Sequence, residues 1–315
     1  MRIQFVQDFI DKLRRKKQDA ERYNIKVLLD YLDNLNPNDL KCCDNVYEYK
    51  YDKRTILLAQ LFDKFASKFN ISLIHKNIFD YSLLITPDNV HTQRILEFNY
   101  PVDSYPELYL FEKYNKKFDI VFDVGANIGM SACYFAKKAK QVYAFEPMPH
   151  LVEKFKKNIV INNFSNINII EKAISNCCKK DQFCVYESDG HGSLLHHDQS
   201  KYLKSVDVDI ITLDKLCFEN DIKHIDMMSV DVEGYEYEVL EGAQNLLKNK
   251  AVDIILFEVV KGYLKQDKIN KLFKYIESFD YEIFNLELEK VNSKNLNFHQ
   301  DLLAMPKGKK NLLFS

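Results

Sequence analysis

The segment Phe118-Asp-Ile-Val-Phe-Asp-Val-Gly-Ala-Asn-Ile-Gly129 joins an apolar run to two closely spaced glycines. The run predicts a buried strand, and Gly125 and Gly129 predict a turn that opens a helix. In parallel α/β sheets a ligand lies against such a turn, outside the carboxyl end of the strand. The chain has only eight glycines in 315 residues. We therefore expect these two to stand where the backbone requires glycine.

Short apolar runs alternate with segments of helical periodicity on the carboxyl-terminal side of this segment. The predicted strands cover residues 120–124, 142–145, 167–170, 225–230 and 254–257, and the predicted helices cover 128–138, 151–161, 235–248 and 265–278. Residues 281–285 and 301–305 predict two final strands that pair in antiparallel fashion. This alternation is typical of a doubly wound, mostly parallel α/β sheet with helices on both faces.

The amino-terminal part of the chain shows a different pattern of apolar residues. Residues 1–70 show helical periodicity and predict a helical extension, whereas 71–315 form the α/β unit. A basic cluster, Arg14-Arg15-Lys16-Lys17, lies within this extension. It is interpreted as a solvated helix face, and contact with a membrane surface or another anionic partner is the alternative.

Composition limits the classes of function. Hydrophobic residues make up 46% of the chain and charged residues 29%, which excludes a disordered chain. The net charge of −2 gives no reason to expect a nucleic-acid partner. The chain has seven cysteines, no signal-peptide pattern and no apolar run of transmembrane length, so we expect a cytoplasmic protein with reduced thiols. Composition leaves the oligomeric state open.

The polar residues around the glycine turn favour one cofactor class. The spacing Gly125-x-x-x-Gly129 does not match the dinucleotide fingerprint G-x-G-x-x-G. Asp123 would repel a pyrophosphate and suits a ligand with a cationic head, such as S-adenosylmethionine. Glu146, at the end of the next strand, is placed to bind ribose hydroxyls, and the backbone of Ala173 and Ile174 to contact adenine. The candidate cofactor-binding residues are Asp123, Gly125, Ala126, Asn127, Gly129, Ser131, Glu146, Pro147, Ala173, Ile174 and Asp231.

Further motifs follow in a characteristic order. They are Ala-Phe-Glu-Pro-Met-Pro149, Ala-Ile-Ser175, Ile-Thr-Leu-Asp214, Val-Asp-Val-Glu-Gly-Tyr-Glu236, Val-Leu-Glu-Gly-Ala243 and Ile-Leu-Phe-Glu258. With Asp-Val-Gly-Ala-Asn-Ile-Gly129, this order resembles the FkbM-type S-adenosylmethionine-dependent methyltransferases over about residues 95–306. The resemblance implies a class I methyltransferase-like, seven-stranded sheet with one reversed strand. It also implies methylation of hydroxyl groups, often of sugars or polyketide-type products. The family commonly has a lysine at the position of Ser229.

Four residues are candidates for the catalytic work. Asp231 ends a strand and could act as general base, while Glu233 could orient the acceptor or the sulfonium. Glu258 closes the next strand, and His191 lies in the long insertion 177–220 that the resemblance associates with the acceptor pocket. A solvated helix start rich in acids is the alternative for Asp231 and Glu233.

Methyl transfer from a sulfonium requires no metal, and we expect none to be obligatory. Two weaker metal hypotheses involve the histidines of the insertion (His191, His196, His197) and three nearby aspartates (Asp207, Asp209, Asp214).

These features together predict an S-adenosylmethionine-dependent O-methyltransferase. Its expected acceptor is a hydroxyl of a carbohydrate, a glycan or a related polyol, bound as a small-molecule or glycan substrate. A nicotinamide-dependent oxidoreductase and a cofactor-binding interaction module without catalysis are the alternatives. The missing third glycine and Asp123 argue against the oxidoreductase.

Overall fold

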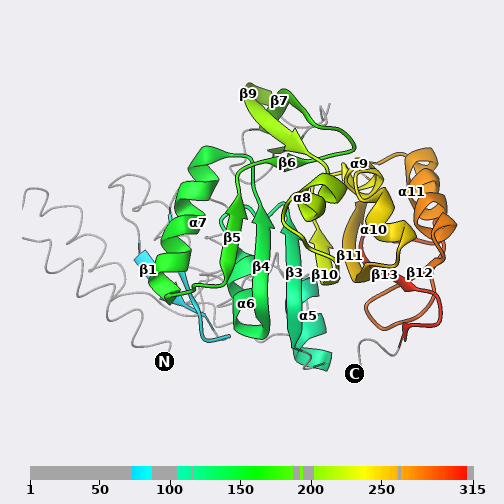
Figure 1. Cartoon of the computed structure of the whole chain (residues 1–315), viewed down its shortest axis with the longest axis horizontal. Helices are drawn as coiled ribbons and strands as arrows, with labels where there is room; N and C mark the ends of the chain where they lie inside the picture. Colours follow the sequence, from blue (N-terminus) through cyan, green and yellow to red (C-terminus); the bar gives the residue numbers. More distant parts are fainter. Residues whose placement is uncertain are drawn as a thin grey trace, which may run out of the picture.

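The computed structural model describes residues 73–77, 79–86, 105–114, 117–186, 192–193, 202–261 and 264–310 (Figure 1). The predicted helical extension 1–70 with its basic cluster lies outside these residues, as do His191, His196 and His197. None of the described helices is both long and apolar enough to cross a bilayer.

A seven-stranded sheet forms the centre of the described chain (Figure 1). Its spatial order is β12-β13-β11-β10-β3-β4-β5. β13 pairs antiparallel with both of its neighbours, whereas the other pairs are parallel, so β13 is the reversed strand. The predicted seven-stranded sheet is thereby confirmed. The strands are β3 (Phe118–Val124), β4 (Ala139–Phe145), β5 (Ile167–Ile170), β10 (Ile225–Val230), β11 (Val252–Val260), β12 (Tyr281–Phe284) and β13 (His299–Pro306).

Helices pack on both faces of this sheet, as successive strand residues show. On β3, Val121 belongs to the hydrophobic core that includes residues of α5, α6 and α7. The next residue, Phe122, belongs to the opposite core with α8, α9, α10 and α11. Alternate strand residues point to opposite faces, so the doubly wound arrangement follows. The helices are α5 (Tyr105–Tyr114), α6 (Met130–Lys138), α7 (Pro149–Asn162), α8 (Leu213–Glu219), α9 (Glu236–Glu241), α10 (Gln244–Lys248) and α11 (Gln266–Ser278).

The prediction of one helix over 235–248 is wrong, because the segment forms α9 and α10 with a break at Gly242 and Ala243. A Cβ on Gly242 would lie 2.1 Å from the carbonyl oxygen of Ser175, so the chain passes this backbone closely at the break. Helix α5 is a further element that is absent from the predicted set. Its signal is the pattern Ser104-Tyr-Pro-Glu107, in which a capping-type serine precedes a proline and a first-turn acid.

The described residues of the insertion 177–220 form regular secondary structure. They contribute to a second, four-stranded sheet of order β6-β9-β7-β8, and then form α8. In Figure 1 this sheet lies beyond the edge at which β4 and β5 end. Its strands are β6 (Ala173–Ile174), β7 (Lys179–Tyr186), β8 (Gly192–Ser193) and β9 (Tyr202–Ile211).

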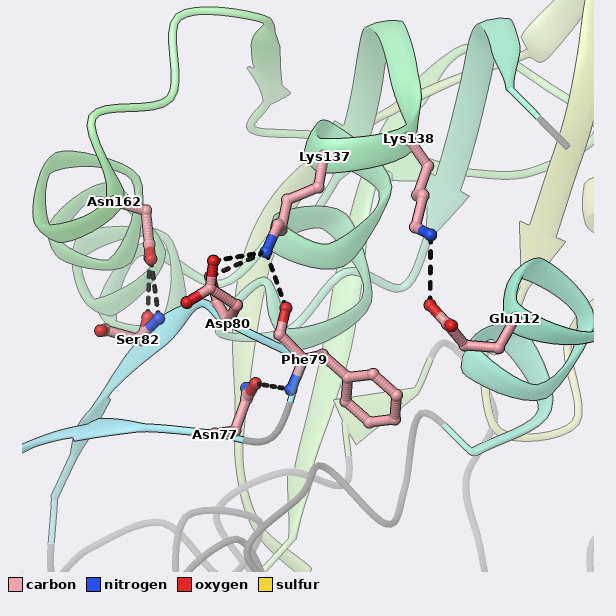
Figure 2. A network of polar contacts seen from close by, with 8 residues as sticks. All are labelled: Asn77, Phe79, Asp80, Ser82, Glu112, Lys137, Lys138 and Asn162. Carbon is pink, nitrogen blue, oxygen red and sulfur yellow. Dashed lines mark hydrogen bonds and ion pairs between the residues drawn. The ribbon is translucent and has the colours of Figure 1, made fainter. Parts of the chain in front are cut away.

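A hairpin of β1 (Leu73–Lys76) and β2 (Ser82–Ile85) is fastened to α6 and α7 (Figure 2). The Asn162 amide both accepts from the backbone N–H of Ser82 and donates to its carbonyl, each at 2.7 Å. Lys137 donates to the carbonyl oxygens of Phe79 and Asp80 at 2.7 and 2.8 Å.

Helix α6 also holds α5. Its Lys138 lies 3.2 Å from the Glu112 carboxylate, as Figure 2 shows, and Tyr134 donates a hydrogen bond to the same carboxylate. Phe111 of α5 stacks on Phe135 of α6, with ring centroids 5.1 Å apart. These contacts fix α5 against α6 and thereby position Glu107, a first-turn residue of α5.

Candidate active site

The loop after β3 is held by the neighbouring strand ends. The backbone N–H groups of Gly125 and Ala126 both donate to the carbonyl of Phe145, at 3.1 and 3.0 Å. Gly125 has φ +95°, and a Cβ there would lie 1.8 Å from the carbonyl oxygen of Asp231. Glycine is therefore required at this position because the loop after β10 passes too close to leave room for a side chain.

Gly129 is required by packing between helices. It has φ +81°, and a Cβ there would lie 2.0 Å from the ring of Phe155 on α7. The expected glycine turn is confirmed. At both glycines a Cβ would collide with a neighbouring segment, namely the loop after β10 at Gly125 and α7 at Gly129.

Glu146 follows β4 and is 5% exposed. Its two carboxylate oxygens accept backbone N–H groups from Asn127 at 2.9 Å and from Met148 at 2.8 Å. Each oxygen keeps a further acceptor site, which is what two ribose hydroxyls need. Burial raises the pKa of Glu146 to about 7, although these two hydrogen bonds act in the opposite direction.

Asp123 lies at 4% exposure near the end of β3. Its Oδ2 is buried and has no hydrogen-bond partner in the described chain. Burial raises the pKa of this carboxyl to about 7. A buried oxygen without a partner is costly, and a cationic ligand group would satisfy it. Asp123 and Glu146 therefore fit the head and the ribose of S-adenosylmethionine.

The strand register places the acidic residues on one face of the sheet. Asp123 pairs with Ser229 between β3 and β10, and Glu258 pairs with Asp301 between β11 and β13. These four residues point to the face of the sheet that α5 and α6 cover. The residue two positions away from each of them on its strand belongs to the hydrophobic core on that face, and side chains two apart on a strand share a face. Parallel strands end at the same edge, and β13 begins there because it runs in the opposite direction.

Asp231 follows β10 in a tight loop. Its N–H donates to the Val124 carbonyl at 2.9 Å, and the loop then turns through Glu233 (φ +55°) and Gly234 (φ +91°). The buried Glu236 accepts from the Gly234 N–H at 3.0 Å, which closes the turn. The motif's final acid thus has a structural role that the sequence analysis did not assign.

Asp231 is exposed as a residue, whereas its carboxyl lies among the carboxyls of four glutamates. Its pKa is raised well above the ordinary value by desolvation and by the charges of Glu258, Glu233, Glu107 and Glu236. A carboxylate with a raised pKa is a stronger base near neutral pH than an ordinary aspartate.

Glu107 is the main site residue that the sequence analysis missed. It lies on α5 at 6% exposure and accepts a hydrogen bond of 2.9 Å from the Ser229 hydroxyl. Burial, together with the charges of Asp123 and Asp301, raises the pKa of Glu107 to about 8. Its Oε2 has no hydrogen-bond partner in the described chain. Ser229 therefore serves as a neutral hydrogen-bond partner of Glu107.

The remaining predicted residues lie around the same edge. Ala173 and Ile174 form β6, which pairs with β9 and is buried. Ser131 is the second residue of α6, and Pro147 lies between β4 and α7.

The hypothesis of a magnesium site at Asp207, Asp209 and Asp214 is wrong. Asp207 accepts from Gln182 and Asp209 lies 3.4 Å from Lys180, both on the second sheet. Asp214 accepts the backbone N–H groups of Asn245 and Leu246, the second and third residues of α10. Within the described residues, these three carboxylates do not form a metal-type cluster.

A family model decides between the possible cofactor classes. The model of the methyltransferase FkbM domain matches residues 123–283, which run from Asp123 at the end of β3 to Ile283 in β12. The chain belongs to the FkbM methyltransferase family. The resemblance of the motifs is thereby confirmed, and S-adenosylmethionine is the cofactor that the family implies. The match favours this class over a nicotinamide oxidoreductase.

Several curated relatives carry methyltransferase names. Methyltransferase 1 of Beauveria bassiana is 26% identical over 214 residues, which cover 60% of this chain and 75% of that protein. Hexuronic acid methyltransferase AglP of Haloferax volcanii is 28% identical over 149 residues, covering 47% of this chain and 59% of AglP. The crystal structure of an FkbM methyltransferase from Methylobacillus flagellatus has a TM-score of 0.41 at 14% identity, covering 80% of this chain and 59% of that one.

Proposed function

We propose that this FkbM methyltransferase transfers the methyl group of S-adenosylmethionine to a hydroxyl of a carbohydrate, a glycan or a related polyol. The observation that supports the proposal is that Asp123, Glu146 and Asp231 all lie at the carboxyl edge of the sheet. Asp123 offers an unpartnered oxygen to a cation, Glu146 offers acceptor sites to ribose, and Asp231 is a carboxylate of raised pKa. When bound, S-adenosylmethionine supplies a methyl group already activated by the sulfonium.

The residues of the chain then divide the remaining work. Asp231 removes the proton of the acceptor hydroxyl, and Glu233, in the same tight loop, orients the acceptor or the sulfonium. The hydrogen bonds of the loops to Phe145 and Val124 hold both strand ends in a fixed relation. Fixed alignment of the two reactants lowers the barrier by up to about 7–11 kcal/mol in ideal cases. A general base typically raises the rate by roughly 10²–10⁴-fold, which corresponds to a smaller lowering of the barrier.

The names of two relatives support a glycan acceptor. One is the hexuronic acid methyltransferase AglP, and another is the 2-O-methyltransferase NoeI of Sinorhizobium fredii, 24% identical over 146 residues. This chain spans 59% and 58% of their respective lengths. The second sheet, β6 to β9, lies beyond the cofactor edge and is proposed to frame the acceptor.

Two experiments test the proposal. A thermal-shift titration with S-adenosylhomocysteine should raise the melting temperature, since a ligand at 100 times its Kd adds about 2.7 kcal/mol to the folded state. NAD should have no effect. A radiolabelled-methyl assay against uronic-acid glycans and neutral glycans should then label a hydroxyl. Absence of any shift with S-adenosylhomocysteine at millimolar concentration would reject the cofactor assignment, and binding without labelling of any pool would favour a non-catalytic module.

A further inference from the structure

Two clusters of metal-type side chains occur in the described residues, at opposite ends of the parallel strands. One consists of His224, Asp226 and Asp253 near the starts of β10 and β11. Asp226 is already engaged there, because its Oδ2 accepts the backbone N–H groups of Asp119 and Ile120 at 2.9 and 2.7 Å. The Asp226 carboxylate of this first cluster therefore has a structural role, because it links β10 to β3.

The second cluster consists of Glu258, His299 and Asp301, at the carboxyl edge where Asp231 lies. One potential ligand atom from each residue lies within 4.8 Å of the others. Donors held about 2.2 Å from one ion lie at most about 4.4 Å apart, so small side-chain rotations would bring the three together.

The backbone itself directs these three side chains to one place. Glu258 of β11 pairs directly with Asp301 of β13, and His299 pairs with Val260. His299 and Asp301 are two residues apart and therefore point to the same face. In an antiparallel pair, direct and diagonal neighbours on one face are within contact range. The arrangement thus rests on strand register, with no contribution from a loop.

Further carboxyl groups lie around this cluster. The carboxyl of Glu107, 6% exposed and with Oε2 unpartnered, is close enough to Asp301 for their charges to interact. Glu258 in turn interacts with Asp231 and Asp301. His299 is the basic residue whose charge acts on Asp301.

We propose that Glu258, His299 and Asp301 bind a divalent first-row cation such as Mn²⁺ beside the methyl-transfer site. One imidazole and two carboxylates form a donor set that suits such ions. The His299 side chain is 57% exposed, which leaves the cluster open to an ion from solvent, and its Nε2 now lies 2.8 Å from Glu258 Oε1. Three protein ligands leave coordination positions free for oxygen atoms of an acceptor. That last role depends on the proposed function, whereas binding of the cation does not.

The test uses Mn²⁺ alone with the full-length protein, without S-adenosylmethionine. Titration followed by the electron paramagnetic resonance signal of free Mn²⁺ should reveal one site per chain. His299→Ala should weaken binding by at least about tenfold. His224→Ala is the matched control, because it removes the same side chain from the cluster at the other end of the strands, and it should bind as the wild type does. Binding should be tighter at pH 8 than at pH 6, because the imidazole must be neutral to coordinate.

The proposal is overturned if the wild type binds no Mn²⁺ at millimolar concentration, or if His299→Ala binds like the wild type. Equal losses in His299→Ala and His224→Ala would also overturn it. Circular dichroism checks that both variants are folded, and Asp301→Asn provides a second variant if His299→Ala is not. A protein that binds Mn²⁺ but transfers no methyl group would reject the proposed function and leave the cation site standing.

Discussion

The Ser229 hydroxyl donates a 2.9 Å hydrogen bond to the Glu107 carboxyl, which joins β10 to α5 across 122 residues of sequence. A neutral hydroxyl cannot hold an adjacent carboxyl in its charged form as an ammonium would. Glu107 accordingly has a pKa raised to about 8, mainly by burial, and is mostly protonated at neutral pH.

The pH dependence of stability should reveal this neutral acid. The pKa of Glu107 is raised from 4.5 to about 8 in the folded protein, so the folded state binds more protons than the unfolded state between those values. The contribution of Glu107 is therefore fully present below pH 4.5 and falls by up to about 1.4 kcal/mol per pH unit as the pH rises toward 8. Glu107→Gln, which is neutral at every pH, should lose less stability over this range. Urea unfolding at several pH values measures the difference, and parallel profiles of wild type and variant would reject the neutral state.

Glu146→Ala should weaken cofactor binding. A charge-assisted hydrogen bond contributes about 1.5–3 kcal/mol, so the affinity for S-adenosylhomocysteine should fall roughly 10- to 150-fold. Stability should also fall, because the N–H groups of Asn127 and Met148 lose their acceptor. Isothermal titration calorimetry measures the affinity. Glu171→Ala is the control, since Glu171 is a half-exposed residue paired with Lys156, and it should leave the affinity unchanged. An unchanged affinity in Glu146→Ala would reject the ribose assignment.

Gly129→Ala should destabilise the protein by at least about 2 kcal/mol, because the new Cβ meets the Phe155 ring in a left-handed backbone conformation. Gly308→Ala is a close control: its φ of +75° is similar, but nothing lies within 4 Å of the added Cβ. It should cost only the backbone strain, about 1 kcal/mol. Chemical denaturation of both variants separates packing from strain. Equal losses would show that Phe155 does not require the glycine.

Asp231→Asn tests the general base. The amide has the shape of the carboxylate but takes no proton, so kcat should fall about 10²–10⁴-fold while S-adenosylhomocysteine affinity stays within a few-fold. In the wild type, the rate should rise with pH through a pKa well above the usual 3.8 of aspartate, because the base must be deprotonated. A kcat within threefold of the wild type would exclude Asp231 as the base. A parallel loss of affinity and rate would assign it to cofactor positioning.

The sequence by itself determined the parallel sheet and the edge of it that carries the candidate site. The apolar run ending at Val124 and the acid Glu146 after β4 are local patterns, because a buried strand and its following turn depend on residues adjacent in the chain. For the same reason the strands 167–170 and 225–230 were predicted at their observed bounds, whereas 254–257 covers only the middle of β11. The break of the predicted helix 235–248 was missed, since it depends on the close passage of Ser175 beside Gly242.

Only the tertiary structure decided how the acids are partnered. Glu107 meets Ser229, and His299 meets Glu258, through the packing of α5 on the sheet and the reversed direction of β13. Neither pair leaves a local signal in the sequence, because each joins residues that only folding brings together. The charge state of these carboxyls depends on burial and on neighbouring charges, both of which are properties of the folded chain.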